Sequence, residues 1–213
     1  MTTGPWTHSE MMTKAVGMAT RETLALLSAH LANGPAPSRP GRVRVYVANH
    51  GWIDLPDWPP ATGEGVLYLQ PGGRIAATAP PADAAPSTFR YDPAQPTPTV
   101  GGRLLSPQSG YKSDDQLVER DDVLSFTSGP LDADLYVCGN PVVELAHESD
   151  NPHFDVFVRI GEVDERGRSR NVSDGYRRFA AQPDGPIRIE LDAIAHRFRA
   201  GSRVRVLVAG GSH

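Results

Sequence analysis

The sequence has little cysteine, no long apolar run and no excess of basic residues. Cys138 is the only cysteine among 213 residues, which excludes an intrachain disulfide and a zinc site built from several thiolates. No stretch approaches the ~18 continuous apolar residues of a membrane span, and the N-terminus lacks the basic and apolar regions of a secretory signal. The net charge of -4 gives no basic surface for binding phosphates. We therefore expect a cytoplasmic protein with no membrane or nucleic-acid partner.

Several motifs that carry chemistry are also absent. The sequence has no His-Glu-x-x-His, Cys-x-x-Cys, P-loop or Gly-x-Gly-x-x-Gly motif, so we expect no metal and no cofactor. No serine stands in a Gly-x-Ser-x-Gly elbow, the strand-to-helix turn that exposes the nucleophile of α/β-hydrolases. Most histidines are interpreted as surface or satisfied polar residues, namely His30, His50, His147, His153 and His196.

Proline and glycine are abundant, at 20 and 21 residues, but residues 11–33 contain no proline. Apolar residues recur there at helical spacing, which predicts one amphipathic helix capped by Gly34. The face that should seek an apolar partner consists of Met12, Val16, Ala19, Leu24, Leu27 and Leu31. The proline-rich run 34–41 predicts a stiff linker. We therefore place a domain boundary between residues 1–40 and 41–213.

From residue 42 onward the apolar period changes from 3.6 to 2, which is typical of half-buried strands. Alternation or short apolar runs predict strands over residues 42–48, 66–69, 88–91, 123–127, 134–138, 142–146, 154–160, 187–191 and 204–208. Because no helix separates them, we expect antiparallel pairing in two packed sheets, a sandwich or jelly roll. The segments 72–86 and 92–113, rich in Pro, Ala, Gly and Ser, are expected to be long loops.

His8 differs from the other histidines because of its position. It lies in the turn-rich segment Gly4-Pro5-Trp6-Thr7-His8-Ser9, directly before the expected helix. In α/β-hydrolases the triad histidine follows the last strand, and its neutral imidazole takes the serine proton and returns it to the leaving group. From position alone, two interpretations stay open: a catalytic histidine, and a histidine near a disordered terminus.

A series of further segments follows His8 in a characteristic order. They are Ala29–Gly34, Trp52–Pro60, Tyr91–Gly102, Arg120–Ser128, Pro130-Leu131, Phe154–Val158, Asp174–Arg177 and Gly201–Val206. Together with the histidine segment, they resemble the cocaine-esterase and X-Pro dipeptidyl-peptidase group of acyl hydrolases, which includes cephalosporin acylases. The resemblance covers essentially the whole chain, and its specificity lies in the ordered set rather than in any single motif.

This resemblance implies a mainly β fold, a galactose-binding-like jelly-roll β-sandwich preceded by one helix left over from an α/β-hydrolase domain. It implies that His8 is the general base and acid of a serine triad acting on a small acyl ester, amide or peptide. Leu104, Leu105 and Ser106, in the proline loop, are implied to line an acyl site, with ordinary loop packing as the alternative. Because the family's serine and acid precede the histidine segment, we expect a chain truncated at both ends and inactive alone.

Two other functions stay open. A free-standing β-sandwich could bind carbohydrate or a protein partner. Trp52 and Trp58 would then form a sugar-stacking platform, and packing at one end of the sandwich is the alternative for both rings. The apolar face of the expected helix, without a sheet to cover it, predicts self-association into a homo-oligomer.

Overall fold

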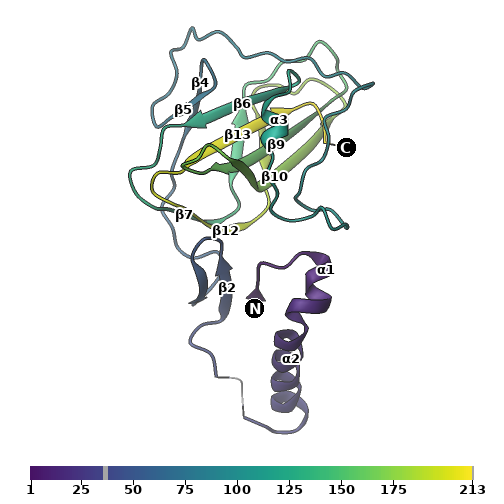
Figure 1. Ribbon diagram of the computed structural model, residues 1–213, viewed down its shortest axis with the longest axis vertical. Helices are drawn as coiled ribbons and strands as arrows, with labels where there is room; N and C mark the ends of the chain where they lie inside the picture. Colours follow the sequence, from purple (N-terminus) through teal and green to yellow (C-terminus); the bar gives the residue numbers. More distant parts are fainter. Residues whose placement is uncertain (36–37, 213) are drawn as a thin grey trace.

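The computed structural model describes residues 1–35 and 38–212, which form an N-terminal helical segment beside a β domain (Figure 1). The N-terminal segment consists of β1 (Thr2–Thr3), α1 (His8–Glu10), the π-helical turn η1 (Met11–Ala15) and α2 (Val16–Leu31). The helix expected over residues 11–33 is therefore present and begins earlier, at His8. The expected linker 34–41 includes residues 36 and 37, which lie outside the described residues.

The C-terminal end of α2 differs from the expectation by one residue. Asn33, and not Gly34, adopts the left-handed conformation, with a φ of 53°. The amides of Ala32 and Gly34 both donate to the carbonyl of Ser28, at 3.1 and 2.9 Å. Asparagine takes this place because its short polar side chain tolerates a positive φ.

Polar contacts attach α2 to the neighbouring strands. Thr2 Oγ1 donates to Glu22 Oε2 at 2.8 Å, and the Arg39 guanidinium pairs with the same carboxylate at 2.7 Å. β1 pairs in parallel with β2 (Val43–Val47), which pairs antiparallel with β3 (Gly51–Leu55). The N-terminal segment is therefore joined to a small three-stranded sheet.

The apolar face predicted for the helix is largely exposed. The exposed fractions are 76% for Met12, 60% for Leu24 and 79% for Leu31. Figure 1 shows α2 extending away from the β domain. No helix in the described part of the chain is long and apolar enough to span a membrane.

A six-stranded sheet forms the base of the β domain, with strand order β10-β9-β13-β6-β5-β4. Its strands are β4 (Tyr68–Gln70), β5 (Arg74–Ala76), β6 (Val123–Ser128), β9 (Phe154–Val163), β10 (Ser169–Phe179) and β13 (Arg203–Ala209). All neighbours pair antiparallel except β5 and β6, which run parallel. β9 and β13 lie inside the sheet, with a paired strand on each side. Their alternating apolar residues point to one face of the sheet.

Two short strand pairs cover one face of this sheet: β8 (Val142–Leu145) with β11 (Ile187–Glu190), and β7 (Leu135–Gly139) with β12 (Ile194–Phe198). Val156 and Val158 of β9 are fully buried in the core that includes β11. Phe157 points to the opposite face, where it packs in a second core with Leu117 of α3 (Asp115–Val118). The alternation along β9 thus buries apolar side chains on both faces of the sheet.

The expected fold class is confirmed, since the chain is mainly β with one leading helix; the specific jelly-roll topology stays a prediction. Several strand predictions were wrong. β3, β10 and β12 form where no strand was expected, and β5 lies inside the expected loop 72–86. Residues 88–91 form no strand. Phe89 packs there against the core as a partly buried side chain, so an apolar run indicated burial without strand pairing.

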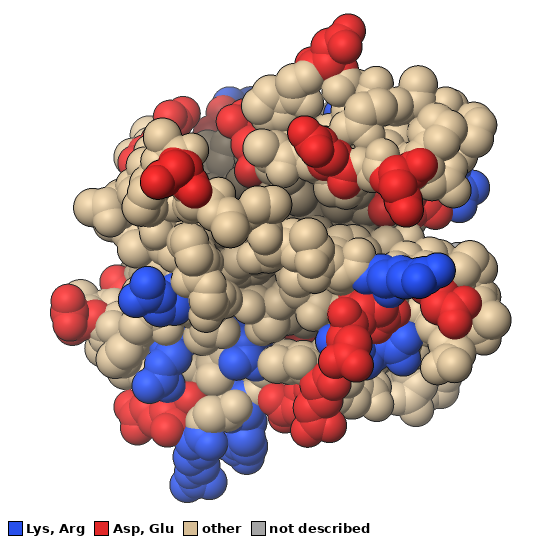
Figure 2. Space-filling model, turned by 90° about the horizontal axis from the view of Figure 1, so that it is seen from above, with Lys and Arg blue, Asp and Glu red and all other residues tan. Residues whose placement is uncertain are grey.

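Charged side chains of both signs share the surface of the β domain. In the view of Figure 2, acidic groups lie along the upper part of the face, and basic and acidic groups lie beside one another below. Some form pairs, such as Arg168 with Asp164 at 2.7 Å and Arg178 with Asp155 at 2.8 Å. Exposed ion pairs contribute little to stability because solvent screens them, so the apolar cores hold the fold together.

Candidate functional site

His8 is the first residue of α1, and its side chain is exposed. Glu10 folds back over this turn, and its Oε2 accepts hydrogen bonds from the backbone amide and hydroxyl of Thr7 at 3.1 and 3.2 Å. Hydrogen bonds from Lys14 and from the Thr7 amide lower the pKa of Glu10 to about 2. Among the described residues, the imidazole of His8 has no hydrogen-bond or ion-pair partner. The backbone at His8 is therefore fixed, while its ring is available to another group.

Aromatic contacts hold the segment before His8 against β3. The ring of Trp6 lies 5.6 Å from that of Trp52, and Tyr46 meets Trp52 edge-on at 5.5 Å. The guanidinium of Arg44 lies 5.4 Å from the centre of the Trp52 ring. Aromatic and cation–π contacts of this kind favour a defined geometry. The position of His8 is thus tied to the β2–β3 hairpin.

Both tryptophans considered for sugar stacking take part in packing. The ring of Trp52 contacts both Trp6 and the guanidinium of Arg44. Trp58 packs on the small core formed by residues 43–47. These contacts support the packing interpretation of the two rings.

The predicted acyl-site residues lie on a loop that is closed at its base. Gly102 and Gly110 exchange backbone hydrogen bonds of 2.8 and 2.9 Å. Their φ angles of 72° and 79° lie in the region that glycine adopts without strain. At the tip, the Ser106 hydroxyl accepts a hydrogen bond from the Gln108 amide at 3.1 Å. Ser106 therefore uses its side chain to turn the loop.

Leu104 and Leu105 differ in their surroundings. Leu105 is 83% exposed. Leu104 borders a cavity of about 230 Å³, which is lined by Thr99, Gly101, Arg103, Leu104, Phe157, Asp174, Gly175, Tyr176 and Ser212. At the rim, Arg103 pairs with Asp192 at 2.9 Å. This volume is below the roughly 300–1,000 Å³ of typical ligand pockets, so it fits only a small group.

The base of the 102–110 loop lies against the residue next to His8. A Cβ placed on Gly110 would come within 2.8 Å of Thr7 Cγ2, so a larger residue would push the two segments apart. The structure therefore brings the histidine segment and the base of the loop together. Residues 104–106 make no hydrogen bond or ion pair with His8 in the described chain. Their assignment to an acyl site stays a prediction.

Sequence reasoning missed a buried ion cluster beneath this loop. The Arg159 side chain, 1% exposed, donates to both carboxylate oxygens of Asp174 at 2.7 and 2.8 Å. Asp114 is fully buried 3.7 Å from the same guanidinium. Burial raises the pKa of Asp114, although the positive charge of Arg159 acts in the opposite direction. A Cβ on Gly102 would approach Asp174 to 2.4 Å, so the cluster supports the base of the loop.

A second polar group, buried in part, lies where the β2–β3 turn meets the β domain. It consists of Asn49, Glu162, Arg170 and His196, and we call it the junction cluster. Glu162, 5% exposed, accepts a hydrogen bond from Arg170 Nη2 at 2.6 Å and lies 3.2 Å from His196 Nε2. Burial opposes its ionisation, but hydrogen bonds from His196, Arg170 and Asn49 prevail and lower the pKa of Glu162 to about 2. No local motif signals this cluster, because its members are far apart in the sequence.

Cys138 and the acidic residues give no sign of a metal site. Cys138 is half-buried, and burial raises the pKa of its thiol, which disfavours the thiolate that metals bind. Within the described chain, no group of three or more His, Cys, Asp or Glu side chains is placed to hold a metal ion.

Comparison with known proteins relates the sequence to ester-hydrolysing enzymes. Cocaine esterase of Rhodococcus sp. (strain MB1 Bresler) is 27% identical over 247 residues, covering 98% of this chain and 43% of the relative. A Mycobacterium bovis (strain ATCC BAA-935 / AF2122/97) protein named as a serine esterase is 26% identical over 197 residues, covering 75% of this chain and 30% of the relative.

Solved structures show a similar fold. An α-amino acid ester hydrolase superposes with a TM-score of 0.82 at 24% identity, covering 99% of this chain and 42% of the other. An aminopeptidase from a marine-sediment Thaumarchaeota archaeon superposes with a TM-score of 0.80 at 26% identity, covering 92% and 37%. The chain thus spans less than half the length of these relatives.

A family match covers most of the sequence. Residues 36–213 match the X-Pro dipeptidyl-peptidase C-terminal non-catalytic domain. This range includes the whole β domain and the β2–β3 hairpin. The chain therefore belongs to the family of X-Pro dipeptidyl-peptidase C-terminal domains, and its relatives are hydrolases of the cocaine-esterase type.

Proposed function

We propose that this chain is the C-terminal part of a serine acyl hydrolase, in which His8 is the general base and acid and the 102–110 loop borders the acyl site. The observation that carries the proposal is the packing of Gly110 on Thr7, which sets the base of the loop beside the histidine segment. The family match and the esterase names of the sequence relatives support the reaction class.

In this mechanism, a serine from outside the chain attacks the substrate carbonyl. The neutral imidazole of His8 takes the serine proton and gives it to the leaving alcohol or amine, which produces an acyl-enzyme. The same imidazole then activates the water that releases the acid. A carboxylate must hold the imidazole in the correct tautomer. Because no described residue does so, that carboxylate also comes from outside the chain.

The cavity beside the loop bears on the substrate class. Its volume of about 230 Å³ and the side chains of Leu104 and Phe157 fit a small apolar acyl group. Exposed Leu105 would extend this surface toward a bound substrate. We therefore propose small acyl esters, amides or short peptides as substrates. The carbohydrate-binding alternative has no comparable support, because Trp52 and Trp58 are packed.

The proposal is tested by comparing the purified chain with a chimera. In the chimera, this chain replaces the matching region of Rhodococcus cocaine esterase, so that the remainder of that enzyme completes the active site. We expect the chimera to hydrolyse 4-nitrophenyl acetate and the chain alone to show no turnover above buffer. Turnover by the chain alone that survives His8→Ala would overturn the proposal, as would a folded chimera that is inactive.

A further inference from the structure

The junction cluster crosses the boundary between the hairpin that carries the histidine segment and the β domain. Asn49 lies in the β2–β3 turn with a φ of 64°. Its Nδ2 donates to Glu162 Oε2 at 3.0 Å and to the Arg197 carbonyl at 2.8 Å, and its Oδ1 accepts from Arg170 Nη2 at 2.7 Å. The side-chain amide of Asn49 therefore bonds to three strands, β9, β10 and β12.

Backbone pairing supports the same crossing. The amide of Ala48 donates to the Ala195 carbonyl at 2.9 Å, and the Arg197 amide donates to the Ala48 carbonyl at 3.0 Å. The end of β2 thus continues alongside β12. Hydrogen bonds to charged groups contribute more than neutral ones, so the contacts of Asn49 with Glu162 and Arg170 should dominate the attachment.

From Asn49, the connection continues to His8 through the hairpin. β1 pairs with β2, with Thr3 opposite Val45. His8 comes five residues after Thr3, and between them the tilted ring of Trp6 packs against Trp52 of β3. A rotation of the hairpin relative to the β domain would therefore carry His8 with it.

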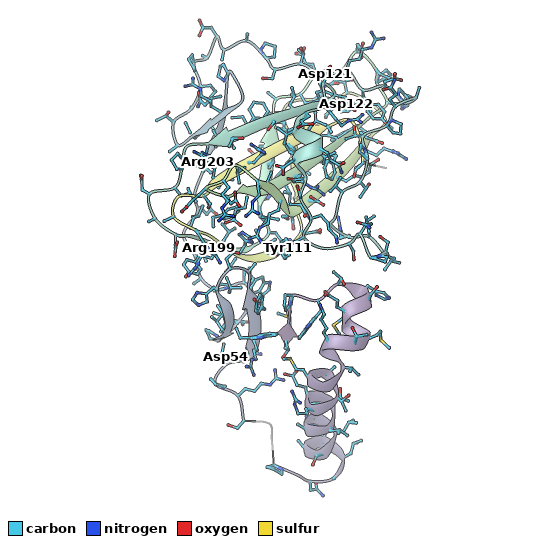
Figure 3. The ribbon with its side chains drawn as sticks, in the orientation of Figure 1. Asp54, Tyr111, Asp121, Asp122, Arg199 and Arg203 are labelled. Carbon is cyan, nitrogen blue, oxygen red and sulfur yellow. The ribbon has the colours of Figure 1, made fainter. Side chains whose placement is uncertain are left out.

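The same cluster also holds the other side of the candidate site. The guanidinium of Arg170 lies 5.8 Å from the centre of the ring of Tyr111, the residue that follows Gly110. The neighbouring Asn171 donates to the Gly110 carbonyl at 3.1 Å and accepts from the Lys112 amide at 2.6 Å. In Figure 3, Tyr111 lies at the edge of the β domain that faces the N-terminal segment. Adjacent residues of β10 thus hold both the hairpin and the base of the loop.

We infer that the junction cluster is a positioning device, in which Asn49, held by Glu162 and Arg170, sets where His8 lies relative to the 102–110 loop. These residues are positioning residues, because none of them belongs to the histidine segment or to the loop. The consequence for catalysis rests on the proposed function. The geometric coupling does not, and it can be measured in this chain alone.

Two substitutions remove the coupling in different ways. Asn49→Gly removes the amide and keeps a residue that accepts the left-handed turn. Asn49→Asp keeps the shape and the turn preference but places a carboxylate against Glu162. The double variant Asn49→Asp with Glu162→Gln restores an amide–carboxylate pair with the roles exchanged, and it serves as the rescue. Asn151→Gly is the matched control, because the exposed Asn151 side chain accepts a local hydrogen bond from the amide of His153, two residues along the same turn.

Position is measured by double electron–electron resonance between spin labels at Ser9→Cys and Gln108→Cys, in a Cys138→Ser background. We expect one narrow distance distribution in the parent and in Asn151→Gly, broad distributions in both single Asn49 variants, and a narrowed one in the double variant. Amide exchange of residues 1–10 should be roughly tenfold or more faster in Asn49→Gly, with β9 and β13 unchanged. An unchanged distance distribution in both single variants would overturn the inference.

Catalysis is measured in the chimera. We expect Asn49→Gly to lower kcat roughly 10- to 100-fold with little change in KM, because a small misplacement of a catalytic group is enough for such a loss. The double variant should recover part of kcat. If Asn49→Gly broadens the distance distribution but keeps the kcat of the parent chimera, the positioning role is overturned. If the parent chimera is inactive while the single Asn49 variants show broadened label distances, the proposed function is overturned and the coupling is established. If Asn49→Gly fails to fold, the double variant decides, and a broad distribution there counts against the inference.

Discussion

The β domain and the N-terminal helix contain similar apolar residues but place them differently. In the sheet, Val156 and Val158 have no exposed surface. In α2, Leu24 and Leu31 are 60% and 79% exposed. Burial of an aliphatic side chain contributes about 1.5–3 kcal/mol, so the β domain gains this contribution many times and the helix hardly at all.

The difference teaches how the candidate site is assembled. The β domain is held by apolar cores, whereas the N-terminal segment that carries His8 is held by polar and aromatic contacts, such as those of Glu22 and Trp6. Polar contacts define direction better than apolar ones, because they need specific distances and angles. The position of His8 should therefore respond to polar substitutions that hardly change the stability of the fold.

The largest contrast is expected between two ion pairs, one in each region. Arg159→Met leaves the carboxylates of Asp114 and Asp174 without their cation in a buried site, and should cost about 3–5 kcal/mol. Lys14→Met removes the exposed partner of Glu10 in the helix and should change the free energy of unfolding far less, because solvent screens the pair. Urea unfolding followed by circular dichroism measures both. Similar losses for the two variants would show that burial does not separate the regions.

A matched pair of leucines gives the next contrast. Leu207 is 1% exposed in β13, and Leu31 is 79% exposed in α2. Leu207→Ala should lower the free energy of unfolding by about 2–5 kcal/mol because it opens a cavity, and Leu31→Ala should change it by less than about 0.5 kcal/mol. A cost above 1 kcal/mol for Leu31→Ala would mean that the helix is buried in solution, for example by a second copy.

The pH dependence of the free energy of unfolding distinguishes Glu162 from Glu10, although the pKa of each carboxylate is about 2. Both Glu162 and Glu10 have a pKa well below 4.5, so their stabilisation is present above about pH 4.5 and is lost as the pH falls toward 2. For buried Glu162 the loss should be about 2–3 kcal/mol, and Glu162→Gln should flatten the decline. Glu10→Gln should flatten the decline less, because solvent screens the exposed hydrogen bonds of Glu10 and reduces their contribution to stability. Equal flattening in both variants would contradict this account.

The smallest effect on stability is expected on the exposed face of α2. Leu24→Glu combined with Leu31→Glu should change the unfolding free energy by about 0.5 kcal/mol or less. The same double variant should reduce binding of an apolar dye and any self-association seen by sedimentation, because it removes exposed apolar area. A dye signal that is unchanged from the parent would place the apolar surface elsewhere.

The sequence allowed the central strands to be predicted, because β9 and β13 alternate apolar and polar residues and both lie inside the sheet. β10 was missed because buried positions of that strand are polar, including Asn171 and Ser173. Their side chains bond to the 110–112 segment and to the Asp192 carbonyl. Such residues are satisfied only by tertiary contacts, which a local pattern does not contain.

The candidate site, like the strands, was predictable from the sequence in part. The turn-rich segment before a helix identified His8 as a candidate, and the structure places its neighbour Thr7 against Gly110. The junction cluster was not predictable, because Asn49 and Glu162 are separated by more than a hundred residues. A histidine such as His196, buried through contact with Glu162, looks in sequence like any surface histidine.

The role of His8 is the central claim, and kcat/KM of the chimera for 4-nitrophenyl acetate tests it most directly. His30→Ala is the matched control, because His30 is an exposed histidine on the same helical segment. We predict that His8→Ala lowers kcat/KM by roughly 10³-fold or more, while His30→Ala leaves it within a factor of about two of the parent. Equal activity of the His8→Ala and His30→Ala chimeras would contradict the account.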